Sequence, residues 1–119
     1  MAALPQSFKH LLAAWNESDL GQIRSHLDKA ITPQIEFTDP NFCIRGIDAF
    51  ENMIKEFRKN APKATCAHTS GYDSHHNRFR YQWTVQVNPN TAVVGYDVTT
   101  LNDDGLVERI DGFFGELPE

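Results

Sequence analysis

Hydrophobic residues recur at helical spacing over two stretches in the first half of the chain. In the first stretch the apolar positions follow i, i+3, i+4 and i+7, and they are Phe8, Leu11, Leu12 and Trp15. This pattern predicts a helix that begins near Pro5, whose fixed φ suits a first helical turn. In the second stretch the positions follow i, i+3, i+7 and i+10, and they are Ile47, Phe50, Ile54 and Phe57. They predict the longest helix, which ends before Ala61-Pro62.

A shorter helix is predicted between these two. Asp19 is a good N-cap with Gln22 three residues later. The apolar residues that would form its buried stripe are Leu20, Ile23 and Leu27. Gly21 disfavours the first helical turn, so the start of this helix stays open. Three N-terminal helices are therefore expected.

The remaining segments alternate with the period of two that is typical of strands. Residues 34–39 alternate polar and apolar side chains as far as Pro40, which predicts a short first strand followed by a loop through Cys43 and Gly46. From Lys63 onward, strands are expected at 64–72, 78–87, 91–101 and 106–115, with turns at 88–90 and Asp104-Gly105. One face of the strand 78–87 carries Phe79, Tyr81, Trp83, Val85 and Val87.

Three helices around one short strand, followed by a four-strand meander, predict an α+β fold in which the helices cover one face of the sheet. A chain of 119 residues is long enough for one core, so residues 1–119 are expected to form a single domain. Aromatic residues lie on both faces of the sheet, with Tyr96 and Phe113 opposite Trp83 and Phe114. A homodimer that covers the second face is therefore predicted.

Composition excludes several classes of partner. The chain has 16 acidic and 11 basic residues, and the basic ones are scattered, so neither nucleic acid nor an anionic membrane is expected to bind. The start, 1–5, has no basic region, and the apolar run 11–15 is too short to span a bilayer, so a cytoplasmic protein is predicted. Cys43 and Cys66 lack metal-type spacing and are expected to be buried or idle thiols, with a disulfide as the alternative.

The order of elements and several short phrases resemble the NTF2-like superfamily, especially its SnoaL-like branch of small bacterial proteins. The phrases are Ala14-Trp15-Asn16, Phe37-Thr38-Asp39-Pro40, Arg45-Gly46-Ile47-Asp48-Ala49-Phe50, Arg80-Tyr81-Gln82-Trp83, Gly95-Tyr96-Asp97-Val98, Asp104-Gly105 and Gly112-Phe113-Phe114-Gly115. The resemblance covers nearly the whole chain. It implies a cone in which three helices pack on a strongly curved, mixed or antiparallel sheet that encloses a pocket. Relatives include polyketide cyclases, epoxide hydrolases, ketosteroid isomerases, dehydratases and non-catalytic binding modules, so no single activity is implied.

Asp97 is the sharpest catalytic candidate. A two-residue hairpin at Asp104-Gly105 would set Asp97 opposite Gly112. The side chains that would share its inward face are Tyr81 and Trp83, through the preceding hairpin, and Thr99, Ile110 and Phe114. A carboxylate desolvated among aromatic rings has a raised pKa and can act as an acid or base near neutral pH. The alternative is that Asp97 pairs with an arginine or with backbone amides and only shapes the fold.

Two further side chains are candidates for proton transfer. Asp39 is one, because the resemblance implies that its strand contributes pocket residues, although an Asp before Pro also serves as a turn cap. His68 would relay a proton from its strand, or else hold a single hydrogen bond as a core or surface residue. The side chains of His75-His76 diverge, so no metal site is expected.

The expected ligand contacts follow from the inward face and the resemblance. They are Trp15, Phe37, His68, Tyr81, Trp83, Thr99, Ile110, Gly112 and Phe114. In the family's epoxide hydrolases and polyketide cyclases an essential acid lies on the final strand, and the resemblance places that position at Gly112. This departure argues against transferring either activity directly and leaves Asp97 and Asp39 as the acids. If the face of strand 78–87 is inverted, Arg80 becomes the polar anchor of the pocket.

The leading hypothesis is a SnoaL-like protein that binds a small, largely apolar molecule and promotes isomerisation, cyclisation or hydration by carboxylate acid-base catalysis. No phosphate-binding loop, nucleophile elbow or dinucleotide fingerprint occurs in the sequence, so no cofactor is expected. The alternative is a non-catalytic dimeric binding or scaffold module. An enzyme should have an open cavity with a convergent polar group, whereas a module should have a packed interior.

Overall fold

The computed structural model describes residues 4–119, which form three α-helices and a seven-stranded sheet. The helices are α1 (Gln6–Trp15), α2 (Ile23–Leu27) and α3 (Ile47–Asn60), with a 3-10 turn at Leu20–Gln22. The strands are β1 (Ile31–Thr38), β2 (Cys43–Arg45), β3 (Thr65–His68), β4 (Asp73–His75), β5 (Arg78–Asn88), β6 (Thr91–Leu101) and β7 (Val107–Phe114). The predicted α+β class is confirmed. Residues 1–3, part of the N-terminal segment without a basic region, lie outside the described part.

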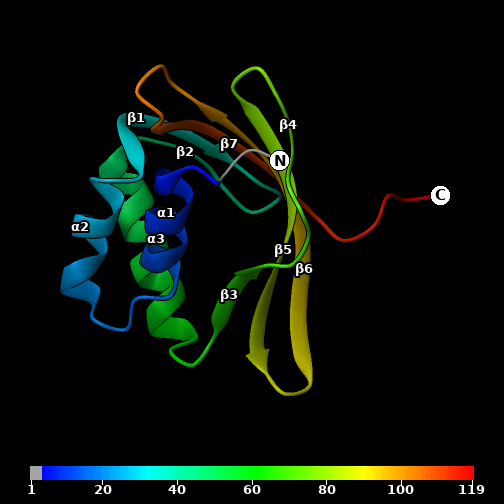
Figure 1. The fold of residues 1–119 in the computed structure, drawn as a ribbon. Coiled ribbons are helices and arrows are strands. Elements are labelled where there is room, and N and C mark those ends of the chain that lie inside the picture. The colour runs from blue at the N-terminus through cyan, green and yellow to red at the C-terminus, as the bar shows by residue number, and fades with distance from the viewer. Residues whose placement is uncertain (1–3) are drawn as a thin grey trace.

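The sheet has the strand order β2-β1-β7-β6-β5-β3, and β4 also pairs with β5. Neighbouring strands are antiparallel except β1 and β7, which are parallel, so the sheet is mixed. Figure 1 shows the three helices gathered on one side of the sheet, while the C-terminal segment after β7 runs away from the other side. One face of β5, β6 and β7 is therefore directed at the helices and the other is not covered by them.

Both long helices bury the faces that their spacing predicts. In α1 the buried apolar residues are Phe8, Leu11 and Ala14, and in α3 they are Phe50, Met53 and Ile54. Phe8 reaches the sheet, where its ring packs 5.1 Å from that of Phe79 and 5.6 Å from that of Tyr81. These contacts join α1 to β5 and form the centre of the core. Within residues 4–119, no helix combines the length and the apolar composition needed to cross a membrane.

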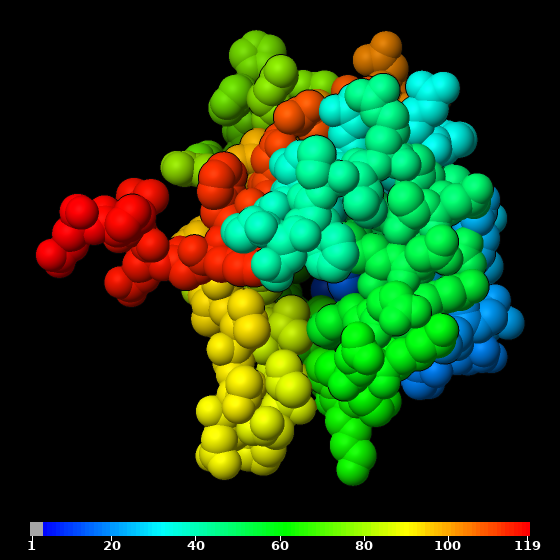
Figure 2. Space-filling model, turned by 180° about the vertical axis from the view of Figure 1, so that it is seen from behind, coloured from blue at the N-terminus to red at the C-terminus, as the bar shows by residue number. Residues whose placement is uncertain are grey.

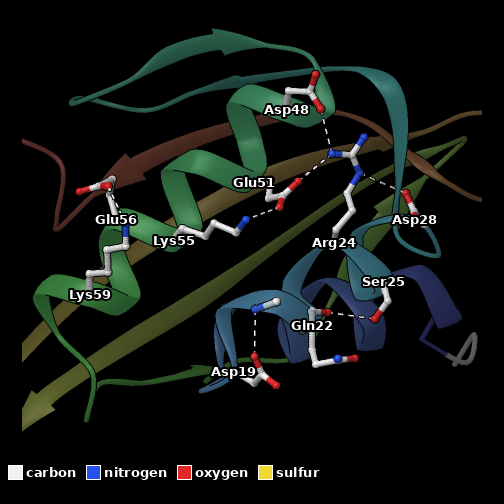
Figure 3. A network of polar contacts seen from close by, with 11 residues as sticks. Asp19, Gln22, Arg24, Ser25, Asp28, Asp48, Glu51, Lys55, Glu56 and Lys59 are labelled. Carbon is white, nitrogen blue, oxygen red and sulfur yellow. Dashed lines mark hydrogen bonds and ion pairs between the residues drawn. The ribbon is translucent and has the colours of Figure 1, made fainter.

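Two arginines hold the helical layer together in different ways. Arg58 of α3 is buried, and its guanidinium donates to the carbonyl oxygens of Trp15, Pro62 and Ala64. Arg24 of α2 is more exposed and forms ion pairs with three carboxylates (Figure 3): Asp28, Asp48 and Glu51. Because Asp48 and Glu51 belong to α3, this second cluster ties α2 to α3.

The predicted second helix begins later than its sequence suggests. Asp19 does act as a cap, and its Oδ1 accepts a hydrogen bond from the backbone N–H of Gly21 at 3.0 Å. The turn that follows, Leu20–Gln22, is 3-10, and regular α-helix begins only at Ile23. A glycine in the first turn weakens the α-helix, which explains the tighter geometry.

The first strand begins earlier than predicted, and the expected loop after it contains a strand. β1 starts at Ile31 and includes Pro33, which lies where the pairing of β1 with β7 is interrupted, so its missing N–H breaks no regular ladder. Cys43–Arg45 forms β2, an edge strand that pairs with 36–38 of β1. A segment of three residues is too short for its alternation to be recognised in the sequence.

The strand predicted at 64–72 is shorter in the structure, where β3 ends at His68, and β4 follows outside the predicted range. β3 and β4 both pair with β5, with His68 opposite Trp83 and Asp73 opposite Arg80. Between them, the hydroxyl of Ser70 accepts a hydrogen bond from the backbone N–H of Gln82 at 2.7 Å. At this interruption a side-chain oxygen, that of Ser70, takes the place of a backbone carbonyl as the hydrogen-bond acceptor. The alternation of the sequence does not reveal such a replacement.

The β6–β7 hairpin is one residue longer at its turn than predicted. The backbone N–H of Asn102 bonds to the carbonyl of Leu106, which leaves a three-residue loop in which Gly105 has a φ of 83°. An irregularity between Thr100 and Leu101 then shifts the register back by one residue. Asp97 therefore lies opposite Gly112, as predicted.

Candidate functional site

A cavity of about 450 Å³ lies on the helix-covered side of the sheet. It is lined by side chains from α1, β1, α3, β3, β5, β6 and β7 and by the segment between β1 and β2. Figure 2 shows its opening as a hollow between that segment, α3 and the β5–β6 hairpin, with atoms of α1 visible at the bottom. A cavity of this volume is in the range of small-molecule sites in proteins.

Most residues predicted to form a site come together around this cavity. Those that line it are Trp15, Phe37, Asp39, His68, Tyr81, Trp83, Asp97, Ile110 and Phe114. Two predicted ligand contacts, Thr99 and Gly112, are not among the lining residues within the described part of the chain, 4–119. Both instead support residues that do line it.

Asp97 presents its carboxyl group to the cavity from β6. Its Oδ1 accepts a hydrogen bond of 2.8 Å from the indole Nε1–H of Trp83. Burial raises the pKa of Asp97 to about 7, and the negative charges of Asp39 and Asp111 add to this effect. Hydrogen bonds from Trp83 and Tyr81 to the carboxylate oppose it. Asp97 can therefore both release and accept a proton near neutral pH.

Trp83 holds its position because the residue opposite it on β6 is a glycine. Gly95 pairs with Trp83, and a Cβ at Gly95 would overlap the indole ring and lie 2.5 Å from the carbonyl oxygen of Phe113. On its other side the Trp83 ring meets Phe114 edge-on at 5.8 Å. The absence of a side chain at Gly95 thus permits the orientation from which Trp83 donates to Asp97.

Thr99 lies behind the cavity wall and is completely buried. Its hydroxyl forms a hydrogen bond of 2.9 Å with that of Tyr81, in which either oxygen can be the donor. Burial is also the main reason why the pKa of Tyr81 is raised, so this phenol stays protonated. Thr99 is thus a positioning residue for Tyr81.

Asp39 lies at the end of β1 and has the turn-capping contacts typical of an Asp before Pro. Its Oδ1 accepts hydrogen bonds of 2.8 Å from the backbone N–H groups of Asn41 and Phe42. Gly112 lies between the two acids: a Cβ there would be 2.9 Å from Oδ1 of Asp97 and 3.3 Å from the Cβ of Asp39. The missing side chain at Gly112 lets the two carboxyl groups approach each other.

His68 faces the cavity from β3. Its Nδ1 forms a hydrogen bond of 2.8 Å with the hydroxyl of Tyr72, and its ring lies 4.4 Å from that of Tyr81. Burial lowers the pKa of His68, so its imidazole is neutral at neutral pH. It is accordingly a polar but uncharged part of the wall.

Sequence reasoning missed part of the wall. The missed lining residues with the greatest bearing on the site are Asn41, Phe42, Met53, Glu56 and Cys66. Phe57, whose spacing in the apolar stripe of α3 made it a candidate for the wall, does line the cavity and packs edge-on against Trp15 at 5.4 Å. Asn41 and Phe42 lie in a segment without periodicity, where no sequence pattern predicted them.

Two other sequence-based alternatives are wrong or lack support. Arg80 does not anchor the cavity, because its Nε donates to Asp73 at 2.6 Å on the exposed side of β5, so the inverted face assignment is incorrect. The prediction that the side chains of His75 and His76 diverge is also wrong, because their Nδ1 atoms lie 3.1 Å apart; both residues are exposed. Among residues 4–119, no group of three His, Cys, Asp or Glu side chains is placed to hold a metal ion.

Comparison with solved structures identifies the fold. A proposed isomerase of the SnoaL-like family from Agrobacterium tumefaciens is 26% identical, with a TM-score of 0.84 over 93% of this chain and 96% of that one. A proposed SnoaL-like polyketide cyclase from Jannaschia sp. is 15% identical, with a TM-score of 0.71 over 96% and 89%. An NTF2-like protein of unknown function from Exiguobacterium sp. is 14% identical, with a TM-score of 0.77 over 93% and 99%.

The chain matches no protein-family model and no curated protein sequence. The agreement in fold extends over 89% or more of each of these solved structures. The chain therefore has the NTF2-like fold, and its structural neighbours are SnoaL-like isomerases, NTF2-like proteins and polyketide cyclases.

Proposed function

We propose that this protein binds a small, largely apolar molecule in its cavity and catalyses a proton transfer in it, as a cofactor-independent isomerase, cyclase or hydratase. The observation that carries the proposal is the carboxyl group of Asp97, which faces an aromatic cavity and has its pKa raised to about 7. An acid or base is most effective when its pKa is close to the working pH. The SnoaL-like protein from Agrobacterium tumefaciens, described as a proposed isomerase, supports this class of reaction.

In the proposed step the ionised Asp97 removes a proton from a carbon next to a carbonyl group of the ligand. The C–H electron pair forms the enolate double bond, and the carbonyl π pair moves to oxygen. Asp97 then returns the proton to the same or another carbon. The Trp83 N–H holds the accepting carboxylate in place, and Asp39 contributes mainly through its negative charge, because its Oδ1 is bonded to two backbone amides.

A non-catalytic module was the alternative, and it would have a packed interior. The cavity of about 450 Å³ and the convergence of Asp97, Trp83 and Tyr81 on it support the catalytic proposal over that alternative. We also propose that residues 1–119 form a single domain and that the protein is cytoplasmic. Free thiols such as Cys43 and Cys66 are typical of a reducing compartment.

Hydrogen–deuterium exchange into an enolisable ketone tests this function without knowledge of the natural substrate. The probe is 2-tetralone in deuterated buffer, an apolar ketone with acidic α-hydrogens, followed by proton NMR. We expect the wild-type protein to speed the exchange above its rate in buffer alone. Asp97→Asn keeps the shape of the side chain and should lower this protein-dependent rate by about 100-fold or more. Asp104→Asn, in the exposed β6–β7 loop, is the matched control and should behave as wild type. Enzymatic exchange that survives Asp97→Asn unchanged would refute the role of Asp97.

We also propose that the outer face of the sheet pairs with a second copy of the chain. Since Asp97 faces the cavity, its neighbours on β6 face outward. The exposed apolar side chains on this outer face are Val94, Tyr96 and Val98 of β6 and Phe113 of β7, which lies opposite Tyr96. Phe113 is 62% exposed, and apolar side chains gathered on one face in this way are typical of surfaces that bind another protein. We expect a dimer in light scattering coupled to size exclusion, and dissociation to monomers for Phe113→Asp. A monomeric wild-type protein would contradict this part of the proposal.

A further inference from the structure

The charges around the cavity are all of one sign. Three carboxyl groups line it, those of Asp39, Glu56 and Asp97, and no Lys or Arg does so within residues 4–119. The remaining basic side chain in the wall, His68, is neutral at neutral pH because burial lowers its pKa. The wall therefore offers negative charge and hydrogen-bonding groups but no cation.

The basic residues nearest in the fold are held elsewhere. Arg109 pairs with Glu36 and Asp111 on exposed parts of β1 and β7. Arg58 is buried, donates to three backbone carbonyl groups, and is not among the residues that line the cavity. Neither side chain can turn toward a ligand without leaving these partners.

Negative charge is most concentrated at Asp97. Gly112 leaves room for Asp39 to approach it, while Tyr81 faces it from β5 and Asp111 acts on it from β7. None of these neighbours is a cation, and the carboxylate is stabilised only by neutral donors such as the indole of Trp83. A second anion placed here would be repelled and would lose its hydration without a compensating partner.

We infer that the cavity selects its ligand by charge: the part of the ligand that enters it carries no carboxylate, sulfonate or phosphate group, and Asp97 is the residue that enforces this selection. The inference rests on the proposed function, since it concerns the ligand of the same cavity. It defines the substrate class more narrowly, as a neutral, mainly apolar molecule whose polar group is a carbonyl, hydroxyl or amide. Acids of the same shape and size are excluded.

A pair of isosteric probes tests the inference. Naphthalene-2-carboxamide is neutral and naphthalene-2-carboxylate is anionic, and their affinities are measured by equilibrium dialysis at about pH 8.5, where most Asp97 is ionised. We expect the wild-type protein to bind the amide at least about tenfold more tightly than the acid. Asp97→Asn should bind the acid more tightly, so the ratio of the two affinities should approach one. The control Asp104→Asn should leave this ratio unchanged.

The possible results separate the inference from the function on which it rests. If the wild-type protein binds both probes equally, or if Asp97→Asn leaves the preference unchanged, the charge selection is refuted while ligand binding stands. If neither probe binds at its solubility limit and 2-tetralone exchange is also absent, the proposed function fails and the inference fails with it. Lowering the pH to about 6 in the wild-type protein should also tighten binding of the acid, because Asp97 becomes protonated while the probe stays ionised.

Discussion

Replacing Gly95 with alanine is expected to destabilise the protein by about 2–3 kcal/mol, a typical value for an overpacked core position. The added Cβ would overlap the indole ring of Trp83 and crowd the carbonyl oxygen of Phe113 on the neighbouring strand. Since Phe113 contributes a backbone atom to this clash, rotation of the Trp83 side chain alone cannot relieve it. The measurement is the free energy of unfolding from urea titration.

The same substitution should also change the site. Displacement of Trp83 would weaken its hydrogen bond to Asp97, so the pKa of Asp97 should rise further. Gly71→Ala is the matched control, because no atom lies within 4 Å of its added Cβ, and its effect should stay within about 0.5 kcal/mol. Equal stability of the two alanine variants would show that the strand pair accommodates a side chain at Gly95.

Replacing Asp97 with asparagine is expected to stabilise the protein at alkaline pH. Because the pKa of Asp97 is raised from 3.8 to about 7 on folding, the folded state holds a proton that the unfolded state releases. The stability of the wild-type protein should therefore fall as the pH rises from about 4 to about 7, by up to about 4 kcal/mol. Asp97→Asn does not lose stability in this way. Its free energy of unfolding should therefore exceed that of the wild type by an amount that grows as the pH rises over the same range.

The measured quantity is the difference in the free energy of unfolding between wild type and Asp97→Asn at each pH, because other groups titrate in the same range. Burial lowers the pKa of His68, so protonation of His68 destabilises the folded state as the pH falls, opposite in direction to the effect of Asp97. This contribution is common to both proteins and cancels. Asp104→Asn controls for the change in net charge. Parallel stability profiles for wild type and Asp97→Asn would mean that the carboxyl group of Asp97 is well solvated.

Periodicity was sufficient to predict the long elements. The apolar stripes of α1 and α3 and the alternation of β5 each extend over several turns or residue pairs. The predicted faces contain the buried residues Phe8, Leu11, Phe50, Ile54 and Tyr81, whereas Ala14 and Met53 are buried without having been predicted. The short strands β2 and β4 were missed because three residues cannot display a period. Their existence depends on pairing with β1 and β5, which is a tertiary effect.

The face of Asp97 was predicted correctly although one detail of the hairpin was wrong. The loop has three residues rather than two, and the irregularity between Thr100 and Leu101 restores the register before it reaches Asp97. A loop of this length with a glycine at positive φ is commonly accompanied by such a bulge. The prediction therefore succeeded because two departures from the simple hairpin compensate each other.

The site was predictable only as far as strand faces determine it. The inward positions of β5, β6 and β7 gave Tyr81, Trp83, Asp97, Ile110 and Phe114. Alternation cannot tell which inward residue reaches a cavity and which lies behind it, so Thr99 was predicted as a ligand contact although Tyr81 covers it. The Trp83–Asp97 hydrogen bond also depends on Gly95, whose role becomes visible only when the ring is in place.

Direct titration of the Asp97 carboxyl group tests the central claim, that a carboxyl group in the cavity is poised to exchange a proton at neutral pH. The protein is labelled with ¹³C-aspartate, the side-chain carboxyl resonances are followed across pH by NMR, and Asp97→Asn identifies the resonance of Asp97. We predict a midpoint at about pH 7. A midpoint near pH 4, the ordinary value for a solvated aspartate, would contradict the claim and remove the basis for acid-base catalysis by this residue.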